Sequence, residues 1–303
     1  MSMVECDYNN ILIKEEAIMR KTTKKLVSMG LSIVTCLAMV TGCGSSTTES
    51  TATGSESSDG VKTIEVAVAN GQPPYTYTDE NGEITGLDVK ILQAVDELLP
   101  EYEFNISIVD WDTMCAGVQS GKYAVGSCCL LNTPARQEVY LLSDDIYYYL
   151  MNLVVRSDSD INSLEDMDGK SMSPFPDSDG LAYVLKQFNE AHPDINITRE
   201  SASEAVPYAD AYAGVQSGRW DAWFGDGASY EVVAKENPDL DLKVTDYVAA
   251  APACFIINKN ETDLQTAING ALGTLKEDGT LAELSVEWLG QDVFEIGEPL
   301  LNN

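Results

Sequence analysis

Apolar and polar positions alternate with two different periods along the chain after residue 60. Residues 61–69 (VKTIEVAVA) form a β-rich run that predicts a strand, and residues 87–99 carry Ile91 and Val95 at helical spacing. Residues 106–109 (ISIV) predict the next strand. Strands that alternate with helices in this way are typical of a parallel sheet covered by helices.

A hexapeptide, AGVQSG, occurs twice, at 116–121 and at 213–218. Each copy predicts the end of a helix, because Gly121 and Gly218 are placed to adopt the left-handed conformation that terminates helices. Strand-like residues follow each glycine, starting at Tyr123 in the first copy. We interpret the repeat as evidence for two similar α/β lobes.

Two further segments, 147–155 and 248–257, are extended and rich in apolar residues. Placed between the lobes, they predict two crossover strands that connect Rossmann-like halves. The expected fold is therefore α/β, with a first lobe formed by 61–148 and 252–295 and a second lobe formed by 149–251.

The first residues carry a targeting pattern. Arg20 and the lysines that follow it precede an uncharged run at 26–40, which is typical of a signal peptide and too short to span a bilayer comfortably. Val40–Cys43 (VTGC) resembles the lipobox of bacterial lipoproteins, and this resemblance implies that Cys43 is lipidated and begins the mature protein. Acidic residues before Met19 favour Met19 as the true start, and residues 1–43 are assigned to the signal peptide.

Residues 44–60 contain ten Ser or Thr among seventeen positions and almost no apolar side chain. Such a composition does not bury enough surface to order itself. The segment is predicted to be a flexible tether between the lipid anchor and the folded lobes.

Charge and histidine content exclude several functions. The chain has 18 Lys and Arg against 49 Asp and Glu, a formal net charge of -31, so nucleic acid is an unfavourable partner. His192 is the only histidine, which removes Ser-His-Asp, Cys-His and multi-histidine metal sites. No phosphate loop, nucleophile elbow or zinc-protease motif is present, so no cofactor and no metal are expected.

The four cysteines after the predicted signal lack the spacing of a zinc or redox motif; they are Cys115, Cys128, Cys129 and Cys254. Adjacent Cys128 and Cys129 are interpreted as small buried residues on a strand, and a disulfide that involves one of them is the alternative. The sequence leaves their redox state open.

A series of short motifs covers residues 61–294 in a fixed order: Pro73-Pro74-Tyr75, Gly86-Leu87-Asp88, Trp111-Asp112, Ser120-Gly121-Lys122-Tyr123, Thr133-Pro134-Ala135-Arg136, Ser143-Asp144, Ser163-Leu164-Glu165-Asp166, Gly169-Lys170, Ser217-Gly218-Arg219-Trp220-Asp221 and Lys276-Glu277-Asp278-Gly279-Thr280. In this order they resemble the amino-acid-binding bacterial extracellular solute-binding proteins of family 3, which have the type II periplasmic-binding-protein fold. The resemblance implies a ligand cleft between the lobes and closure about the two connections.

The resemblance also implies roles for particular residues. Arg136, in a TxxR motif that begins at Thr133, matches the arginine that pairs with a ligand α-carboxylate, and a planar guanidinium suits that contact. Asp226, five residues after Asp221, matches the second-lobe carboxylate that pairs with a ligand α-ammonium. Trp111 stands where the family places an aromatic wall.

Ser178 and Asp179 precede a predicted helix whose backbone amides are suited to an anionic group, and Asp179 as a simple N-cap is the equal alternative. Relatives carry hydroxyl residues just before TxxR, whereas this chain has Cys and Leu at 128–131, so only backbone amides, including those of Cys129 and Leu131, remain for a carboxylate. Gln72 stands at about the position where some relatives have an aromatic residue that stacks on the ligand. A ligand other than a standard α-amino acid is therefore open.

We expect a monomeric, non-enzymatic subunit of an ABC importer, held outside the cytoplasmic membrane by its lipid alone and partnered by a permease and an ATPase. Two alternatives remain from the sequence. One is a periplasmic-type dehydratase acting on a carboxylated ring, which turnover of an added compound would reveal. The other is a sensory module that presents ligand to a receptor, although no signalling domain occurs in the chain.

Overall fold

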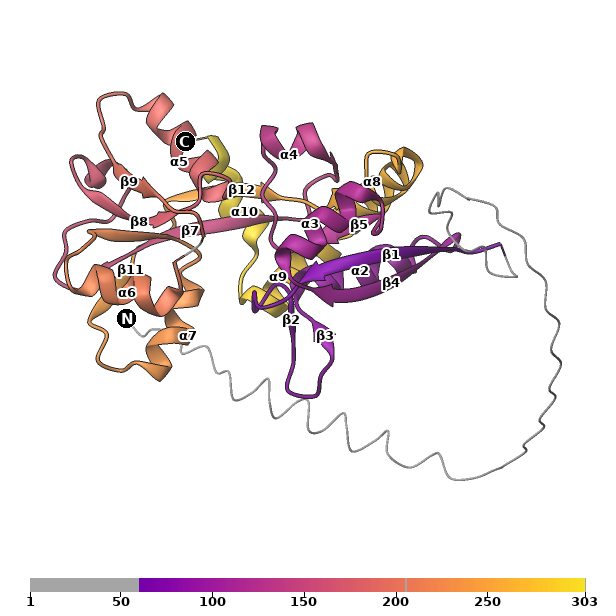
Figure 1. Cartoon of the computed structure of the whole chain (residues 1–303), viewed down its shortest axis with the longest axis horizontal. Coiled ribbons are helices and arrows are strands. Elements are labelled where there is room, and N and C mark those ends of the chain that lie inside the picture. The colour runs from indigo at the N-terminus through magenta and orange to yellow at the C-terminus, as the bar shows by residue number, and fades with distance from the viewer. Residues whose placement is uncertain (1–59, 205, 303) are drawn as a thin grey trace, which may run out of the picture. The chain divides into compact units, whose positions relative to one another are not determined.

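The computed structural model describes residues 60–204 and 206–302 (Figure 1). The predicted signal peptide, Cys43 and all of the predicted tether except Gly60 lie outside the described residues. The described residues form two large β-sheets with helices packed on them and one two-stranded sheet, which confirms the α/β class expected from the alternating pattern.

The first sheet has five strands in the order β4-β1-β5-β13-β6. Strands β1, β4 and β5 are parallel, whereas β13 runs antiparallel to both β5 and β6. A short hairpin of β2 and β3 stands apart from this sheet. The strands are β1 (Lys62–Ala69), β2 (Tyr77–Thr78), β3 (Ile84–Thr85), β4 (Tyr102–Val109), β5 (Val125–Ser127), β6 (Leu141–Leu142) and β13 (Ile256–Ile257).

Alternation along β1 separates two apolar cores, because successive side chains of a strand point to opposite faces. Ile64, Val66 and Val68 join a core with α2, α8 and α9, whereas Ala67 and Ala69 join a core with α3. We call this sheet and its helices the first lobe. Its helices are α2 (Leu87–Glu97), α3 (Trp111–Ser120), α4 (Pro134–Val139), α8 (Thr262–Glu277) and α9 (Thr280–Leu289).

The second sheet has six strands, in the order β11-β7-β10-β8-β9, with β12 paired to β7. We call this sheet and its helices the second lobe. Strand alternation again makes two cores, with Phe224 on the side of α5 and Trp223 on the side of α6. The elements are β7 (Tyr147–Arg156), η1 (Glu165–Met167), β8 (Ser171–Phe175), α5 (Gly180–Ala191), β9 (Thr198–Ser201), α6 (Tyr208–Gln216), β10 (Ala222–Gly225), α7 (Ala228–Glu236), β11 (Leu242–Val244) and β12 (Ala249–Ala253).

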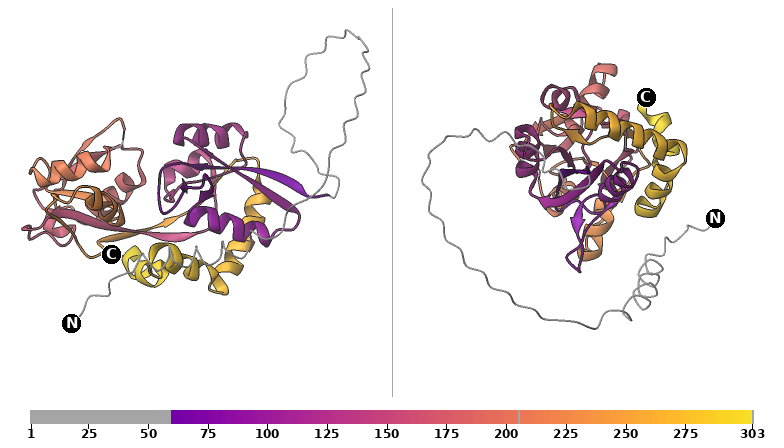
Figure 2. Two further views of the ribbon diagram at one scale, coloured as in Figure 1. Left: turned by 90° about the horizontal axis from the view of Figure 1, so that it is seen from below. Right: turned by 90° about the vertical axis from the view of Figure 1, so that its right-hand side faces the viewer.

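The antiparallel pair of β7 and β12 belongs to both lobes. Tyr147 packs in the large core of the first lobe, whereas Leu153 and Val155, further along the same strand, pack in the second. The C-terminal elements α10 (Val293–Gly297) and η2 (Glu298–Asn302) lie along these two strands (Figure 2). A Cβ atom at Gly297 would meet the Tyr148 Cβ at 2.8 Å, so this contact is tight.

The two hexapeptide copies adopt the same local structure. α3 ends at Gly121 with φ 81°, and α6 ends just before Gly218 with φ 74°, as expected for left-handed helix ends. The strands that follow, β5 and β10, begin two residues later than predicted. Tyr123 packs over Gly117 and Trp220 packs over Gly214, so neither aromatic residue is part of a strand. A Cβ atom at Gly117 or Gly214 would lie 2.4 Å or 2.2 Å from the aromatic ring above it.

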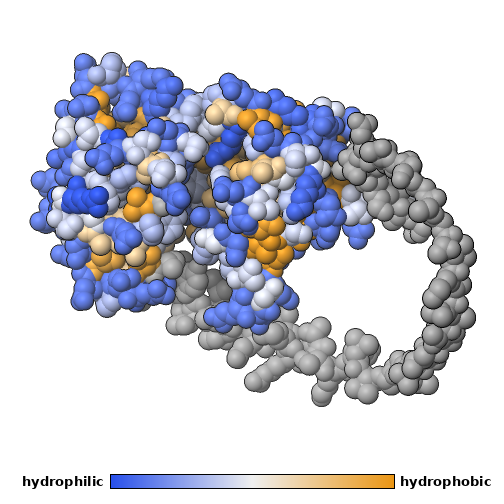
Figure 3. Space-filling view, in the orientation of Figure 1, coloured by the Kyte–Doolittle hydropathy of each residue, from blue (hydrophilic) through white to orange (hydrophobic). Residues whose placement is uncertain are grey.

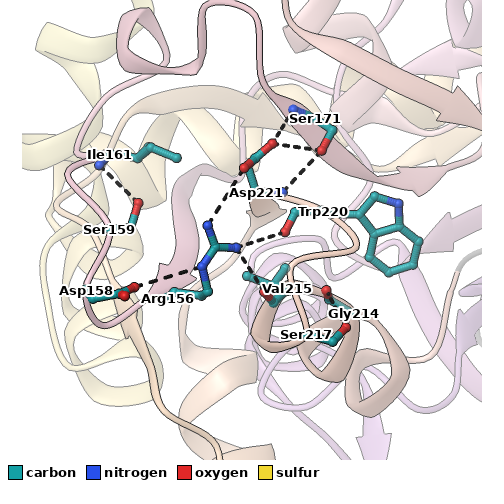
Figure 4. Close-up of polar contacts among 10 residues, drawn as sticks. All are labelled: Arg156, Asp158, Ser159, Ile161, Ser171, Gly214, Val215, Ser217, Trp220 and Asp221. Atoms are coloured by element: carbon teal, nitrogen blue, oxygen red, sulfur yellow. Dashed lines mark hydrogen bonds and ion pairs between the residues drawn. The ribbon is translucent and has the colours of Figure 1, made fainter.

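Polar contacts hold the second copy to the sheet (Figure 4). The Arg156 guanidinium, at the end of β7, donates to the carbonyl oxygens of Val215 and Trp220 at 3.3 Å and 3.5 Å. The Asp221 carboxylate accepts both the backbone N–H and the hydroxyl of Ser171, each at 2.9 Å. Burial raises the pKa of Asp221, but these bonds and the charges of Lys170 and Arg156 outweigh it, so the pKa lies below its usual value.

The face of the molecule in Figure 3 is mainly hydrophilic, with apolar side chains in small separate groups. This surface agrees with the strongly acidic composition. Among the described residues, no helix has both the length and the apolar character needed to cross a bilayer.

Candidate functional site

The loop that follows β5 turns sharply at Cys129. This residue has φ 41°, in the left-handed region that residues other than glycine rarely adopt. Cys129 donates its backbone N–H to Asp88 Oδ2 at 2.9 Å, and Ser127 Oγ donates to the same oxygen at 2.5 Å. The expectation that Cys128 and Cys129 lie on a strand is therefore wrong, since β5 ends at Ser127. All four described cysteines are free thiols, so the alternative of a disulfide among them is also wrong.

Arg136 lies on the short helix α4, which begins directly after this loop. Thr133 caps the helix by accepting the Arg136 N–H at 3.3 Å, and Pro134 occupies the first turn, where its missing N–H costs nothing. Arg136 Nη1 donates to the Leu131 carbonyl at 2.5 Å. The TxxR motif thus folds back on the loop that precedes it.

Asp226 comes immediately after β10 in the second lobe. Its Oδ1 accepts the Ala228 N–H at 2.9 Å, and its Oδ2 accepts the hydroxyl of Tyr75, a residue of the first lobe, at 2.9 Å. Burial raises the pKa of the Asp226 carboxyl, and the two hydrogen bonds oppose that rise. A carboxylate of one lobe is therefore within direct reach of the other.

Three further tyrosines lie around Tyr75, and we call Tyr75, Tyr147, Tyr149 and Tyr208 the tyrosine cluster. The Tyr75 ring stacks on Tyr147 with centroids 5.6 Å apart and lies 5.7 Å from Tyr149. Burial raises the pKa of all four hydroxyls, and the neighbouring Cys129 thiol adds to the rise in each. Cys129 thus lies within electrostatic range of every member.

The start of α5 approaches the first lobe. Asp179 caps this helix by accepting the Leu181 N–H at 3.0 Å, which is the N-cap alternative of the two expected roles. Ser178, one residue earlier, is exposed. A Cβ atom at Gly180 would lie 2.8 Å from the Leu131 Cβ, so the helix start touches the loop that carries Cys129.

Gln72 and Trp111 occupy different positions from the residues above. The Gln72 carbonyl accepts the Tyr75 N–H at 2.7 Å in a tight turn. Gln72 therefore helps to position Tyr75, which is the aromatic residue of this segment that reaches the site. Trp111 is the first residue of α3 and is 44% exposed. Among residues 60–204 and 206–302, no hydrogen bond, ion pair or ring contact joins it to the other candidates.

Opposite charges are separated across the site. The Arg136 guanidinium partly offsets the effect of burial on the thiol pKa values of Cys115 and Cys254, which places this positive charge on the first lobe. Asp226 and Asp179 place negative charge on the second lobe. Such an arrangement suits a small molecule with an anionic and a cationic end. In the described part of the chain, no cluster of side chains has the composition of a metal site.

The sequence did not identify the tyrosine cluster or Asp88 as part of this site. Tyr75 and Asp88 stand in the recognised motifs, but nothing in the motifs shows that their side chains meet others. A signal was available in β7, because a run of three tyrosines puts Tyr147 and Tyr149 on one face of a strand predicted to connect the lobes.

Comparisons with known proteins agree on one family. A family model described as bacterial extracellular solute-binding proteins, family 3, matches residues 64–291. The chain is 28% identical over 274 residues to the L-cystine-binding protein TcyK of Bacillus subtilis (strain 168), covering 90% of this chain and 97% of that protein. It is 25% identical to the arginine-binding extracellular protein ArtP of the same organism, covering 85% of this chain and 96% of that protein.

Solved structures are similar in fold as well. The probable amino-acid ABC transporter extracellular-binding protein ytmK from Bacillus subtilis has a TM-score of 0.63 at 26% identity, covering 77% of this chain and 99% of the other. A structure from work on glutathione import through GshT and the cystine ABC importer TcyBC of Streptococcus mutans has a TM-score of 0.61 at 28% identity, covering 77% and 97%. The type II periplasmic-binding-protein fold expected from the sequence is thereby confirmed.

Proposed function

Because the chain belongs to the bacterial extracellular solute-binding proteins of family 3, we propose that it is the substrate-binding subunit of an ABC importer and binds an amino acid or an amino-acid-like molecule between its lobes. The family is one of binding proteins outside the cytoplasm, not of enzymes. The names of its relatives, which bind L-cystine or arginine, support an amino-acid-like ligand.

One observation carries the proposed mode of binding. Asp226 of the second lobe is half-buried and accepts the hydroxyl of Tyr75 of the first, and the guanidinium of Arg136 lies on the first lobe with one donor used by the Leu131 carbonyl. A guanidinium has five donors, so the bond to Leu131 orients Arg136 and leaves donors for a ligand carboxylate. We assign Arg136 to the carboxylate and Asp226 to the ammonium group of one ligand.

The remaining candidates take supporting roles in this proposal. The backbone amide of Leu131 and the start of α5 at Ser178 and Asp179 add donors near the carboxylate, while Thr133 holds Arg136 in place. The Cys129 amide, expected from the sequence as a further donor, is not available to a ligand because it donates to Asp88. The tyrosine cluster supplies apolar walls around the ammonium end. Gln72 acts by shaping the turn of Tyr75, and Trp111, exposed at the start of α3, is proposed as an aromatic wall for the ligand side chain.

The test first identifies a ligand of the parent protein and then compares the affinity of site variants for that ligand. A thermal-shift panel of common amino acids, including L-cystine and L-arginine, selects the ligand, since ligand at about 100 times its Kd adds about 2.7 kcal/mol of stability. Calorimetry then compares Arg136→Ala and Asp226→Asn with the parent. Each change leaves a ligand charge unpaired in a desolvated site, so each is expected to cost about 2 to 5 kcal/mol of binding.

The matched controls are Arg219→Ala and Asp239→Asn, which alter exposed residues of the second lobe. They are expected to bind like the parent, as exposed charges contribute about 0 to 1 kcal/mol. Arg136→Lys should weaken binding because an ammonium cannot make a two-pronged contact. If both Arg136→Ala and Asp226→Asn bound within about threefold of the parent, the two-ended contact would be wrong.

We also propose that Cys43 carries the lipid that holds the protein at the outer face of the membrane, where as a monomer it delivers ligand to the permease of an importer that an ATPase completes on the cytoplasmic side. The support is the VTGC motif after an uncharged run, and both lie outside the described residues. Expression in a bacterium that acylates lipoproteins should give protein that fractionates with membranes. Intact mass should show acylation of the parent and none of Cys43→Ser; an unmodified Cys43 in the parent would refute the anchor.

A further inference from the structure

Asp88 is a fully buried carboxylate, with 0% of its surface exposed, in the first turn of α2. Among the described residues, no Lys, Arg or His lies within ion-pair distance of it. A buried carboxylate without a cation is unfavourable unless hydrogen bonds compensate for the lost water. Burial accordingly raises the pKa of Asp88, against the effect of its hydrogen bonds. The hydrogen bonds that Asp88 accepts must therefore compensate for the water and the cation that it lacks.

Its three hydrogen bonds all come from parts of the candidate site. Oδ2 accepts the Ser127 hydroxyl at 2.5 Å and the Cys129 N–H at 2.9 Å, and Oδ1 accepts the Tyr147 hydroxyl at 2.8 Å. Ser127 is the last residue of β5 and Cys129 belongs to the loop after it, whereas Tyr147 begins the strand that connects the lobes. One carboxylate therefore joins the loop to the connection.

The loop contact bears on the conformation of Cys129. A left-handed residue other than glycine is strained and persists only where its surroundings determine it. The bond from Cys129 N–H to a buried carboxylate is charge-assisted and therefore strong enough to oppose that strain. The turn at Cys129 in turn sets the direction of Leu131, whose carbonyl holds Arg136.

The other contact leads to the second lobe. Tyr147, held by Asp88, stacks on Tyr75 with centroids 5.6 Å apart, and the Tyr75 hydroxyl donates to Asp226 at 2.9 Å. Packed rings and hydrogen bonds thus connect Asp88 to both charged residues of the site. Neither connection requires Asp88 to touch a ligand.

We propose that Asp88 is a positioning residue, which holds the Cys129 turn and the Tyr147 ring together and so sets the placement of Arg136 and of Tyr75 against Asp226. Its effect on affinity rests on the proposed function, but its effect on the Cys129 turn does not. This difference allows the two to be tested separately.

The experiment compares Asp88→Ala, Asp88→Asn and Tyr147→Phe with the parent. Asp96→Ala is the matched control, because Asp96 is a carboxylate on the same helix that accepts a backbone N–H, from Phe104 at 2.9 Å. Amide hydrogen exchange at Cys129 and at Phe104, followed by NMR, reports on the Cys129 turn and on the start of β4 without any ligand. Calorimetry with L-arginine and with L-cystine reports on binding.

Asp88→Ala should speed exchange at Cys129 but not at Phe104, and Asp96→Ala should do the opposite. Binding should weaken about ten- to a hundredfold in Asp88→Ala, which is the loss expected for a charge-assisted hydrogen bond, and stay within about threefold in Asp96→Ala. Tyr147→Phe should also weaken binding, since it releases the Tyr147 ring while leaving Cys129 bonded.

Asp88→Asn should rescue most of the affinity. Its amide oxygen accepts from Ser127 and Cys129, and its NH₂ donates to Tyr147 Oη, which is able to accept instead. This variant keeps the role testable if Asp88→Ala does not fold. A loss in Asp88→Asn equal to that in Asp88→Ala, or Cys129 exchange no faster in Asp88→Ala than in Asp96→Ala, would overturn the proposal. A parent that binds neither probe would count against the proposed function alone, because the exchange data still decide the role of Asp88.

Discussion

Gly86 allows the packing beneath the site to be tested with a single added methyl group. It precedes α2 with φ 121° and ψ 169°, a conformation open in practice only to glycine. A Cβ atom here would lie 2.1 Å from the backbone oxygen of Tyr75 and 2.9 Å from that of Pro74. These atoms cannot move freely, because they accept the N–H groups of Asp88 and Leu87 at 3.2 Å and 3.0 Å.

The cost of Gly86→Ala has two parts. The backbone conformation contributes about 1 to 3 kcal/mol, and forcing backbone atoms apart contributes about 1 to 3 kcal/mol more. The free energy of unfolding should therefore fall by about 2 to 6 kcal/mol, a large share of the about 5 to 15 kcal/mol typical of proteins. Ligand affinity should fall as well, because the same contact positions Tyr75 and Asp88.

Gly82→Ala is the control, since Gly82 also has a positive φ, 83°, but a Cβ atom there meets nothing within 4 Å. It should lose only about 1 to 2 kcal/mol from its conformation. Urea unfolding of both variants, followed by circular dichroism, measures the difference. Equal losses, within about 0.5 kcal/mol, would show that the close approach to Tyr75 costs nothing and would refute this reasoning.

Three further results are expected. Burial raises the folded-state pKa of Asp226 and Asp88 above the usual carboxyl value. The stability that these groups contribute is therefore complete below about pH 4 and is lost as the pH rises through the raised pKa values. Urea unfolding across this pH range should show a smaller loss of unfolding free energy in Asp226→Asn than in the parent. Gly214→Ala should lower stability by about 1 to 3 kcal/mol, because its Cβ atom would lie 2.2 Å from the Trp220 ring, and an unchanged melting temperature would contradict this. Burial raises the pKa of the Cys254 thiol to about 12, so iodoacetamide should label Cys254 at neutral pH only after unfolding, as peptide mass spectrometry would show.

Local sequence signals predicted most of the fold, because they depend on neighbours in the chain. The run at 61–69 became β1, and the helix predicted at 87–99 became α2. The repeated glycines Gly121 and Gly218 end their helices in the left-handed conformation, which could be predicted because a helix end favours glycine for local backbone reasons. Errors arose where packing overrode local preference, as at Tyr123, which covers Gly117 instead of starting a strand.

The site was only partly accessible to the same reasoning. Motifs marked Arg136, Thr133 and Asp226 as candidates, and the position of Asp179 before a helix predicted the cap that the structure shows, since each signal lies within a few residues of sequence. The strand assigned to Cys128 and Cys129 was wrong because the Cys129 turn is held by Asp88, a residue of a different element. No local pattern encodes that contact.

By itself, the sequence determined the α/β class, the two-lobed repeat and the family, since these follow from periodicity, a duplicated hexapeptide and ordered motifs. Only the tertiary structure decided that Tyr75 meets Asp226 across the lobes and that Asp88 joins the Cys129 turn to Tyr147. The physical reason is that hydrogen bonds and ring contacts between distant residues depend on how the sheets and helices pack. A buried carboxylate such as Asp88 acquires its partners only when three separate elements come together.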